Sequence, residues 1–475
     1  MDLIIRGARV ADGSGAPAVV ADVGIAAGRI AALGHIDTRA SIEIDARGLL
    51  LAPGFVDIHT HFDGQAMWEP RFLPSSHHGV TTIVMGNCGV GFAPVRPADH
   101  NRLVELMEGV EDIPGPTLHA GLDWCWESFA AYLGALERIP HDIDYAAYLP
   151  HAALRVYVMG ERAARLEPAT AVDIARMRAL TAEAVRAGAM GVSTSRSINH
   201  RTSTGESIPT LGASAEELVG LALGLRDAGA GVFQLICDFD DDVDAEFALL
   251  RRVAEVSGRP VTYSLMQKHG KPDGWRRLLD LTAGARAAGL EITAQVAPRG
   301  VGVLLGMQSS RHIFIECPSY QKVAHLPLAG RVAALAAPEL RATLLAEIQA
   351  TRHTRLGKRL TEYANIYLFG EPPDYVPAAA RSIAGQARAL GRDPAELACE
   401  LMLANGGRDW FYSPFANFAA GDIEVCAAML RDPNTVVGLG DGGAHVAMIA
   451  DASFPTFLLS YWGRERGAFP IEWLI

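Results

Sequence analysis

Two histidines one residue apart, His59 and His61, directly follow a short apolar segment of the chain. Residues Phe55–Ile58 have the pattern of a β-strand, and side chains alternate between the two faces of a strand. His59 and His61 therefore share one face at the carboxyl end of that strand. Paired imidazoles beside a carboxylate, here Asp57, are typical of a divalent-metal site. The alternative, two solvated loop histidines, fits the preceding apolar strand less well.

Composition limits the class of protein. The chain has 475 residues, 49% of them hydrophobic, which is enough apolar material for a large core. A net charge of -12 argues against nucleic acid or an anionic membrane as a partner. The chain shows no signal-peptide pattern at its start and no apolar stretch that could span a bilayer. Its six cysteines lack CxxC spacing, which predicts reduced thiols and a cytoplasmic protein.

The first fifty residues differ from the rest of the chain. They contain short apolar strands separated by Gly, Asp and Ala turns, which predicts a small β-sheet with a hairpin at Ala27-Gly28. The expected strands are Asp2–Ile5, Ala18–Ile25, Arg29–Leu33 and Ile42–Ile44.

From Phe55 onward, apolar strands alternate with helix patterns rich in Ala, Leu and Arg. Eight such units predict a parallel sheet closed into a (β/α)8 TIM-type barrel. An open doubly wound sheet is the alternative, but no GxGxxG motif opens a helix. The expected strands are Phe55–Ile58, Thr81–Met85, Tyr145–Leu149, Met190–Thr194, Gly231–Cys237, Pro260–Leu265, Glu291–Val296 and Thr435–Leu439. The expected helices include Pro168–Ala187, Ala215–Ala228, Phe247–Ser257 and Trp275–Ala288.

These patterns predict three regions: a small β-sheet subdomain over residues 1–54, a barrel over 55–445 and a post-barrel tail over 446–475. The stretch around 300–434 is too long for one connection within a barrel. We expect it to carry inserted helices, in a position to cover the site as a lid.

Reactive groups in such barrels gather at the carboxyl ends of the strands. Cys88 follows the second strand in a turn bracketed by glycines, and Asp441 follows the eighth in another glycine-rich turn. A cysteine of this kind is often a small buried hydrophobe, and an aspartate in a glycine turn often forms an Asx-turn. Beside two imidazoles, however, Cys88 becomes a candidate thiolate ligand and Asp441 a candidate ligand that also handles protons.

With these motifs in place, residues 1–445 resemble the amidohydrolase superfamily, and specifically its D-aminoacylase (N-acyl-D-amino-acid deacylase) branch. The matching segments are the leading β-sheet, Gly54–His61, Gly86–Gly89, Gly91–Pro94 and Gly438–His445. The resemblance implies that His59, His61, Cys88 and Asp441 are metal ligands and that Asp441 is also the catalytic proton-transfer residue.

The chain departs from this family at two places. The family carries a histidine on strand five and another on strand six, whereas these strands here offer Gln234, Cys237, Asp238 or Tyr263. We therefore expect one zinc ion and leave a second open. The family also continues past the barrel to strands that complete the leading sheet. About thirty residues follow Asp441 here, so we expect that complement to be missing, the tail to be truncated and a homo-oligomer to be one outcome of the unpaired edge.

Several other polar residues are candidates for substrate binding. The loop after strand four holds Arg196, His200 and Arg201, and arginines at a barrel mouth suit a substrate carboxylate. Tyr263 and His445 complete the candidates. For His151, beside the third strand, we expect a structural hydrogen bond to a backbone carbonyl.

Together these features predict a metal-dependent hydrolase of non-peptide carbon–nitrogen bonds, with a small-molecule amide as substrate and an N-acyl amino acid as the leading candidate. A cyclic-amide hydrolase of the hydantoinase type is one alternative. Most such relatives use a carbamylated lysine on strand four, and strand four here ends in Ser193, Thr194 and Ser195 with no lysine nearby. A degenerate barrel without catalytic activity is the other alternative.

Overall fold

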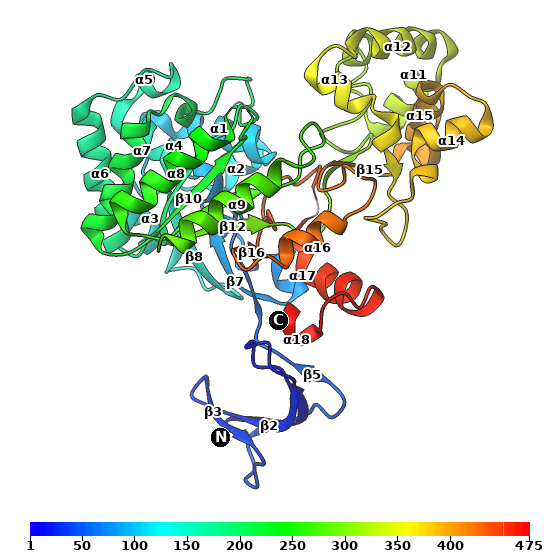
Figure 1. Cartoon of the computed structure of the whole chain (residues 1–475). Coiled ribbons are helices and arrows are strands. Elements are labelled where there is room, and N and C mark those ends of the chain that lie inside the picture. The colour runs from blue at the N-terminus through cyan, green and yellow to red at the C-terminus, as the bar shows by residue number, and fades with distance from the viewer. Residues whose placement is uncertain (241, 450) are drawn as a thin grey trace.

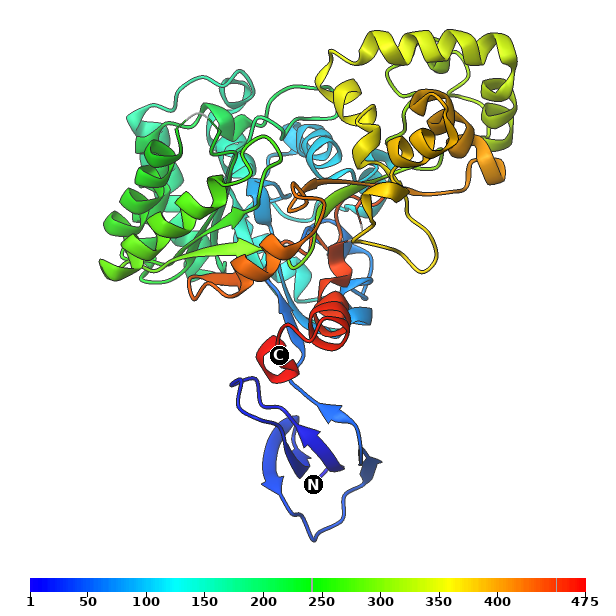
Figure 2. The ribbon, with the colours of Figure 1, turned by 45° about the vertical axis from the view of Figure 1, so that its right-hand side comes forward.

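The computed structural model describes residues 1–240, 242–449 and 451–475. A β-barrel with surrounding helices lies on one side of the molecule, an inserted lobe lies on the other, and the N-terminal sheet projects below them (Figures 1 and 2). None of the helices in the described ranges is long and apolar enough to cross a membrane.

Eight parallel strands form the barrel sheet and follow one another in chain order around it. They are β6 (Phe55–Asp57), β7 (Val80–Met85), β8 (Asp144–Pro150), β9 (Gly191–Arg196), β10 (Val232–Cys237), β11 (Val261–Leu265), β12 (Ile292–Val296) and β16 (Thr435–Val437). The residues just after the first and last strands pair through a parallel bridge between Thr60 and Gly442. All eight expected strands are confirmed, with ends that differ by a residue or two.

Helices cover the outside of the barrel, and the apolar faces of most of them join the outward-facing strand residues in one continuous core. They are α1 (His100–Glu111), α2 (Gly115–Gly121), α3 (Phe129–Leu136), α4 (His151–Met159), α5 (Glu161–Ala164), α6 (Ala171–Arg186), α7 (Ala215–Ala228), α8 (Val243–Ser257), α9 (Gly274–Ala287) and α16 (Glu424–Leu430). The four expected helices correspond to α6, α7, α8 and α9.

The N-terminal sheet contains the expected hairpin at Ala27-Gly28. Its strands are β1 (Leu3–Val10), β2 (Val19–Ala26), β3 (Arg29–Gly34), β4 (Ile42–Asp45) and β5 (Leu50–Leu51), of which β1 runs further than expected. Val20 and Ile30 on this sheet are each 74% exposed, so part of its apolar surface faces solvent. The chain ends beside the sheet, where Glu472 lies 3.6 Å from Arg9.

The inserted segment is more than the helical insertion that the sequence predicts. It forms a lobe with its own hydrophobic core and a three-stranded sheet. Its elements are β13 (Val301–Leu305), α10 (Pro318–Gln321), α11 (Leu328–Ala336), α12 (Pro338–Thr351), α13 (Arg355–Leu360), β14 (Tyr367–Leu368), α14 (Ile383–Leu390), α15 (Pro394–Leu403) and β15 (Phe411–Ala416). After the barrel come α17 (Phe454–Phe457), the π-helix η10 (Leu458–Glu465) and α18 (Ile471–Leu474).

A fully buried ionic cluster ties α4 and α7 to the barrel wall. Glu217 accepts hydrogen bonds from His151 Nε2 at 2.9 Å and from Arg155 Nε at 2.8 Å, and none of these three side chains is exposed. The other ring nitrogen of His151 bonds the hydroxyl of Thr194 at 2.8 Å. The partners of His151 are thus side chains rather than the expected backbone carbonyl. The cluster is structural because all its charges are paired inside the protein.

We expect Glu217→Ala to lower the free energy of unfolding by about 3–5 kcal/mol, because it leaves a buried guanidinium without its carboxylate. Urea unfolding followed by tryptophan fluorescence measures the change. Glu216→Ala, at a neighbouring position where the side chain is 67% exposed, is the matched control and should shift stability by less than about 0.5 kcal/mol. Equal unfolding midpoints for the two variants would contradict the role assigned to the cluster.

Candidate metal centre

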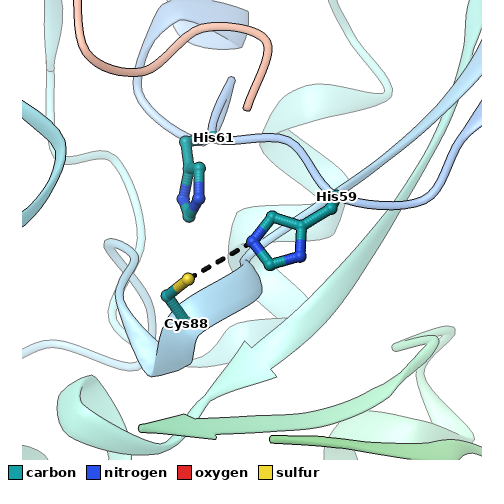
Figure 3. A group of neighbouring side chains, drawn as sticks. All are labelled: His59, His61 and Cys88. Atoms are coloured by element: carbon teal, nitrogen blue, oxygen red, sulfur yellow. Dashed lines mark hydrogen bonds between the residues drawn. The ribbon is translucent and has the colours of Figure 1, made fainter. Parts of the chain in front are cut away.

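Three side chains from the ends of the first two barrel strands converge on one point. His59 and His61 follow β6, and Cys88 lies in the short helical turn η3 (Asn87–Gly89) after β7. One ligand atom from each of the three lies within 4.8 Å of the others, and all three residues are buried. His59 Nε2 is 3.3 Å from Cys88 Sγ, and His61 points toward both (Figure 3). The structure therefore brings together three of the four predicted ligands.

The turn that carries Cys88 is held by its glycines. Gly86 has a φ of 78°, and a Cβ on it would lie 2.6 Å from the carbonyl oxygen of Tyr148. Cys88 itself has a φ of 57°, which is uncommon for a residue with a side chain. The Gly89 amide donates to Ser193 Oγ at 3.1 Å. This packing directs the thiol toward the two imidazoles.

Asp441 follows β16, the last strand of the barrel, and lies near the same three side chains. Its Oδ1 lies 3.5 Å from His59 Nε2 and 3.8 Å from His61 Nε2. Backbone bonds hold it there, because the Asp441 amide donates to the His59 carbonyl and the His61 amide to that of Gly442. Asp441 therefore lies beside the three donors, where it can bind a metal or act on a molecule bound to one.

The donor set suits zinc. Two imidazoles and a thiol are preferred zinc donors, and three protein ligands with an open fourth position are typical of catalytic zinc sites. Both ring nitrogens of His61 are buried and have no hydrogen-bond partner among the described residues. Because an unpartnered buried imidazole is costly, a metal ligand role gives His61 a physical reason to lie there.

Four carboxyl groups lie near the three donors: Asp57, Asp63 and Glu111 are buried, and the side chain of Asp441 is 17% exposed. Burial raises the pKa of Asp57 and of Asp63 to about 7. Burial and neighbouring carboxylates hold the pKa of Glu111 and of Asp441 well above the ordinary range. None of the four forms an ion pair with Lys or Arg in the described ranges. Such a concentration of carboxyl groups without a balancing cation favours a positively charged ligand.

The protonation state of the Cys88 thiol depends on the same carboxyl groups and on a bound cation. Burial, together with Glu111, Asp441 and Asp63, raises its pKa well above the usual value. A thiol in these surroundings is neutral, whereas a bound cation favours the thiolate. Reactivity of Cys88 as a free nucleophile is therefore disfavoured, and its chemistry suits metal binding.

Two residues that the sequence did not reveal support the imidazoles. Gln295 on β12 accepts a hydrogen bond from His59 Nδ1 at 2.9 Å. Glu111, the last residue of α1, places a carboxylate oxygen 3.4 Å from His61 Nδ1. Neither residue lies in a recognisable motif. One signal was available for Glu111, since an acidic residue at the C-terminus of a helix opposes the helix dipole and so points to another role.

Two of the five predicted substrate residues lie close to the donors. His200 bonds the Ser195 hydroxyl at 2.9 Å, and its pKa falls to about 4, mainly because it is buried. His445 has a pKa of about 3 for the same main reason, with His200 and His59 as further causes. Both imidazoles are therefore neutral groups at the edge of the candidate centre.

The other three predicted substrate-binding residues, Arg196, Arg201 and Tyr263, do not face the candidate centre. Arg196 is committed to an ion pair with Glu246, at 2.8 Å, on the outside of the barrel. The Tyr263 hydroxyl bonds Thr282 on α9 at 2.7 Å, so this side chain also points outward. Arg201 is exposed in its loop and donates to the carbonyl of Gly205. The prediction was wrong for Arg196 and Tyr263 because their strand positions alternate with those that face inward.

Strands β10 and β11 supply no further donor to the group. Cys237 Sγ lies 3.4 Å from Glu246, and Asp238 accepts from Ser197 Oγ at 2.8 Å. In the described part of the chain, neither belongs to the group of potential metal ligands. Gln234, fully buried on β10, has no hydrogen-bond partner for its side-chain amide among these residues.

Comparison with known proteins agrees with this architecture. Residues 43–467 match the model of the Amidohydrolase family. The chain belongs to the amidohydrolase family.

The relatives of this amidohydrolase include D-amino-acid deacylases, which confirms the resemblance to that branch. It is 40% identical to the N-acyl-D-aspartate deacylase of Alcaligenes xylosoxydans xylosoxydans over 194 residues, 41% of this chain and 36% of that protein. It is 32% identical to the D-aminoacylase of the same organism over 273 residues, 57% of this chain and 52% of that protein. The matches thus span between about a third and about half of these relatives.

A solved structure shows the same fold. The N-acyl-D-glutamate deacylase of Bordetella bronchiseptica, in complex with zinc and a phosphonate inhibitor, matches with a TM-score of 0.64 at 24% identity. The match covers 100% of this chain and 83% of that one.

We expect Cys88→Ala to reduce bound zinc from about one ion per chain to a small fraction, since thiolate is the strongest donor of the set. Elemental analysis after dialysis against a weak chelator measures the loss. Cys426→Ala, which removes a buried thiol elsewhere, is the control and should keep its zinc. Full zinc occupancy in Cys88→Ala would show that another donor holds the metal.

Proposed function

We propose that this amidohydrolase cleaves non-peptide amide bonds with one zinc ion held by His59, His61 and Cys88, beside Asp441. The observation that carries the proposal is the convergence of these three donors within 4.8 Å inside a cluster of buried carboxylates. The ligand set is three protein donors with one open position, as in catalytic zinc sites. Zinc bound there supplies Lewis acidity toward an amide carbonyl and lowers the pKa of water toward ~7.

Asp441 is the general base and acid of the proposed reaction. A water attacks the amide carbonyl carbon, and Asp441 accepts a proton from that water. The carbon–nitrogen bond then breaks, and Asp441 delivers the proton to the departing nitrogen, because amines leave poorly without protonation. The distances of 3.5 Å and 3.8 Å from Asp441 Oδ1 to Nε2 of His59 and of His61 support this role.

N-acyl-D-amino acids are the proposed substrates. The relatives named above act on N-acyl-D-aspartate and on other N-acyl-D-amino acids, and the motifs of the site belong to the same branch. The neutral imidazole of His200 lies at the edge of the centre, where it can donate a hydrogen bond to an acyl or carboxyl oxygen of such a molecule. The imidazole of His445 also lies there, with its Nε2 toward Glu111.

A hydrolysis screen tests this function. Zinc-loaded protein is incubated with matched N-acetyl-D- and N-acetyl-L-amino acids that have acidic, aliphatic and aromatic side chains, and the released amine is measured with a fluorogenic amine reagent. Activity with D-substrates that disappears when zinc is removed and returns when it is restored supports the proposal. Stoichiometric zinc without turnover of any N-acyl amino acid would rule out the deacylase assignment, and absence of bound metal would favour a degenerate barrel.

We expect Asp441→Asn to keep most of its zinc and its fold but to lose at least ~100-fold in kcat, the usual scale for removal of a general base. Asparagine keeps the shape and a carbonyl oxygen but cannot accept the proton. Asp280→Asn, the same change at an exposed position of α9, serves as the control. A near wild-type kcat for Asp441→Asn would transfer the base role to another residue.

A further inference from the structure

The carboxylate of Glu111 contacts two imidazoles at once. Its Oε1 lies 3.4 Å from His61 Nδ1, and its Oε2 lies 3.4 Å from His445 Nε2. Its side chain is 2% exposed. His61 Nδ1 and Glu111 Oε1 have no hydrogen bond to any other group in the described ranges. A hydrogen bond between His61 Nδ1 and Glu111 Oε1 would therefore replace no existing hydrogen bond of either atom.

The direction of this contact decides which nitrogen of His61 is free. A cation in the centre favours the ionised form of Glu111. A carboxylate accepts hydrogen bonds and donates none, so an imidazole that bonds ionised Glu111 carries its proton on Nδ1. The lone pair then lies on Nε2, which faces the centre and is 3.8 Å from Asp441 Oδ1. The separation from Glu111 is longer than an ordinary hydrogen bond, but such bonds commonly tighten when a site is loaded.

His59 shows the same arrangement with a different partner. The side-chain oxygen of Gln295 accepts from His59 Nδ1 at 2.9 Å, which leaves Nε2 free to face Cys88 at 3.3 Å. Each imidazole thus has an oxygen acceptor behind it and the centre in front of it. Hydrogen-bond acceptors behind a ligating histidine fix its tautomer and orientation and strengthen metal binding.

The position of Glu111 has no evident benefit for folding. It ends α1, where the helix dipole disfavours negative charge, and no Lys or Arg pairs with it among the described residues. Burial of such a group costs stability. The backbone carbonyl of Glu111 also accepts a hydrogen bond from the His445 amide. Glu111 therefore contacts both the backbone and the side chain of His445, in the loop after β16.

We propose that Glu111 is a positioning residue that holds His61 in the Nδ1–H tautomer with Nε2 directed at the metal, and that anchors His445 beside it. This inference rests on the proposed zinc site. It adds that the two ligating histidines are oriented by different acceptors, a neutral amide for His59 and a carboxylate for His61.

Glu111→Leu tests the inference, because leucine fills similar space but accepts no hydrogen bond. We expect zinc affinity, measured by competition with a chromophoric chelator, to fall about 10–100-fold. The apoprotein should unfold at a temperature no lower than wild type, since a buried acidic group has been removed. A purely structural role predicts the opposite pattern, with reduced stability and unchanged zinc affinity. Glu105→Leu, at an exposed position of α1, is the matched control.

A second measurement on wild-type protein covers the case in which Glu111→Leu does not fold. In zinc-loaded protein labelled with ¹⁵N-histidine, two-bond proton–nitrogen spectra should show His61 protonated at Nδ1, with the signal assigned by its loss in His61→Gln. Zinc affinity of Glu111→Leu equal to wild type, or His61 protonated at Nε2, would overturn the inference and leave the zinc site in place. Absence of zinc binding by wild type would instead overturn the proposed function.

Discussion

The candidate centre depends on the pairing between the residues that follow the first and the last barrel strands. Two backbone hydrogen bonds, from the Asp441 amide to His59 and from the His61 amide to Gly442, fix these segments side by side. The approach is close enough that a Cβ on Gly440 would collide with the carboxylate of Asp57. Because both segments are held by backbone, the spacing of the imidazoles from Asp441 follows from the closure of the barrel and not from flexible side chains. The thiol comes from a different strand and has its own support, the tight turn around Cys88.

This arrangement carries an electrostatic cost that explains the chemistry of the centre. Asp57, Asp63, Glu111 and Asp441 are removed from most of the solvent, and each buried charge without a partner costs several kcal/mol. A divalent cation favours the ionised forms of these carboxyl groups and of the Cys88 thiol at the same time. The same groups that are unfavourable without a cation therefore become ligands and supports with one, and metal binding and stability of this region are coupled.

The barrel and the four candidate metal ligands could be predicted from the sequence, because both depend on the periodic alternation of strands and helices. The alternation of strands and helices indicated the barrel, and the places where strands end indicated His59, His61, Cys88 and Asp441. Contacts between distant segments left no such pattern, so Gln295 and Glu111 were missed. Arg196 and Tyr263 were chosen by residue type without regard to which face of the strand they occupy. Inward-facing Ser195, which bonds His200, and outward-facing Thr194, which bonds His151, show how the alternation runs on β9. If one residue on each strand were known to face inward, the alternation would have shown that Arg196 and Tyr263 face outward.

The inserted lobe is attached to the same loops that form the centre. The Leu304 amide on β13 donates to the Met448 carbonyl at 2.6 Å, and Ser309 Oγ donates to the Ala447 carbonyl at 2.6 Å. Ser310 Oγ donates to Asp112, the residue after Glu111, at 2.8 Å. The lobe therefore contacts both the loop after β16 and the end of α1, which together carry Asp441, His445 and Glu111. A displacement of the lobe would pull on the acceptor behind His61 and on the loop of the general base, so the geometry of the centre and the position of the lobe are physically linked.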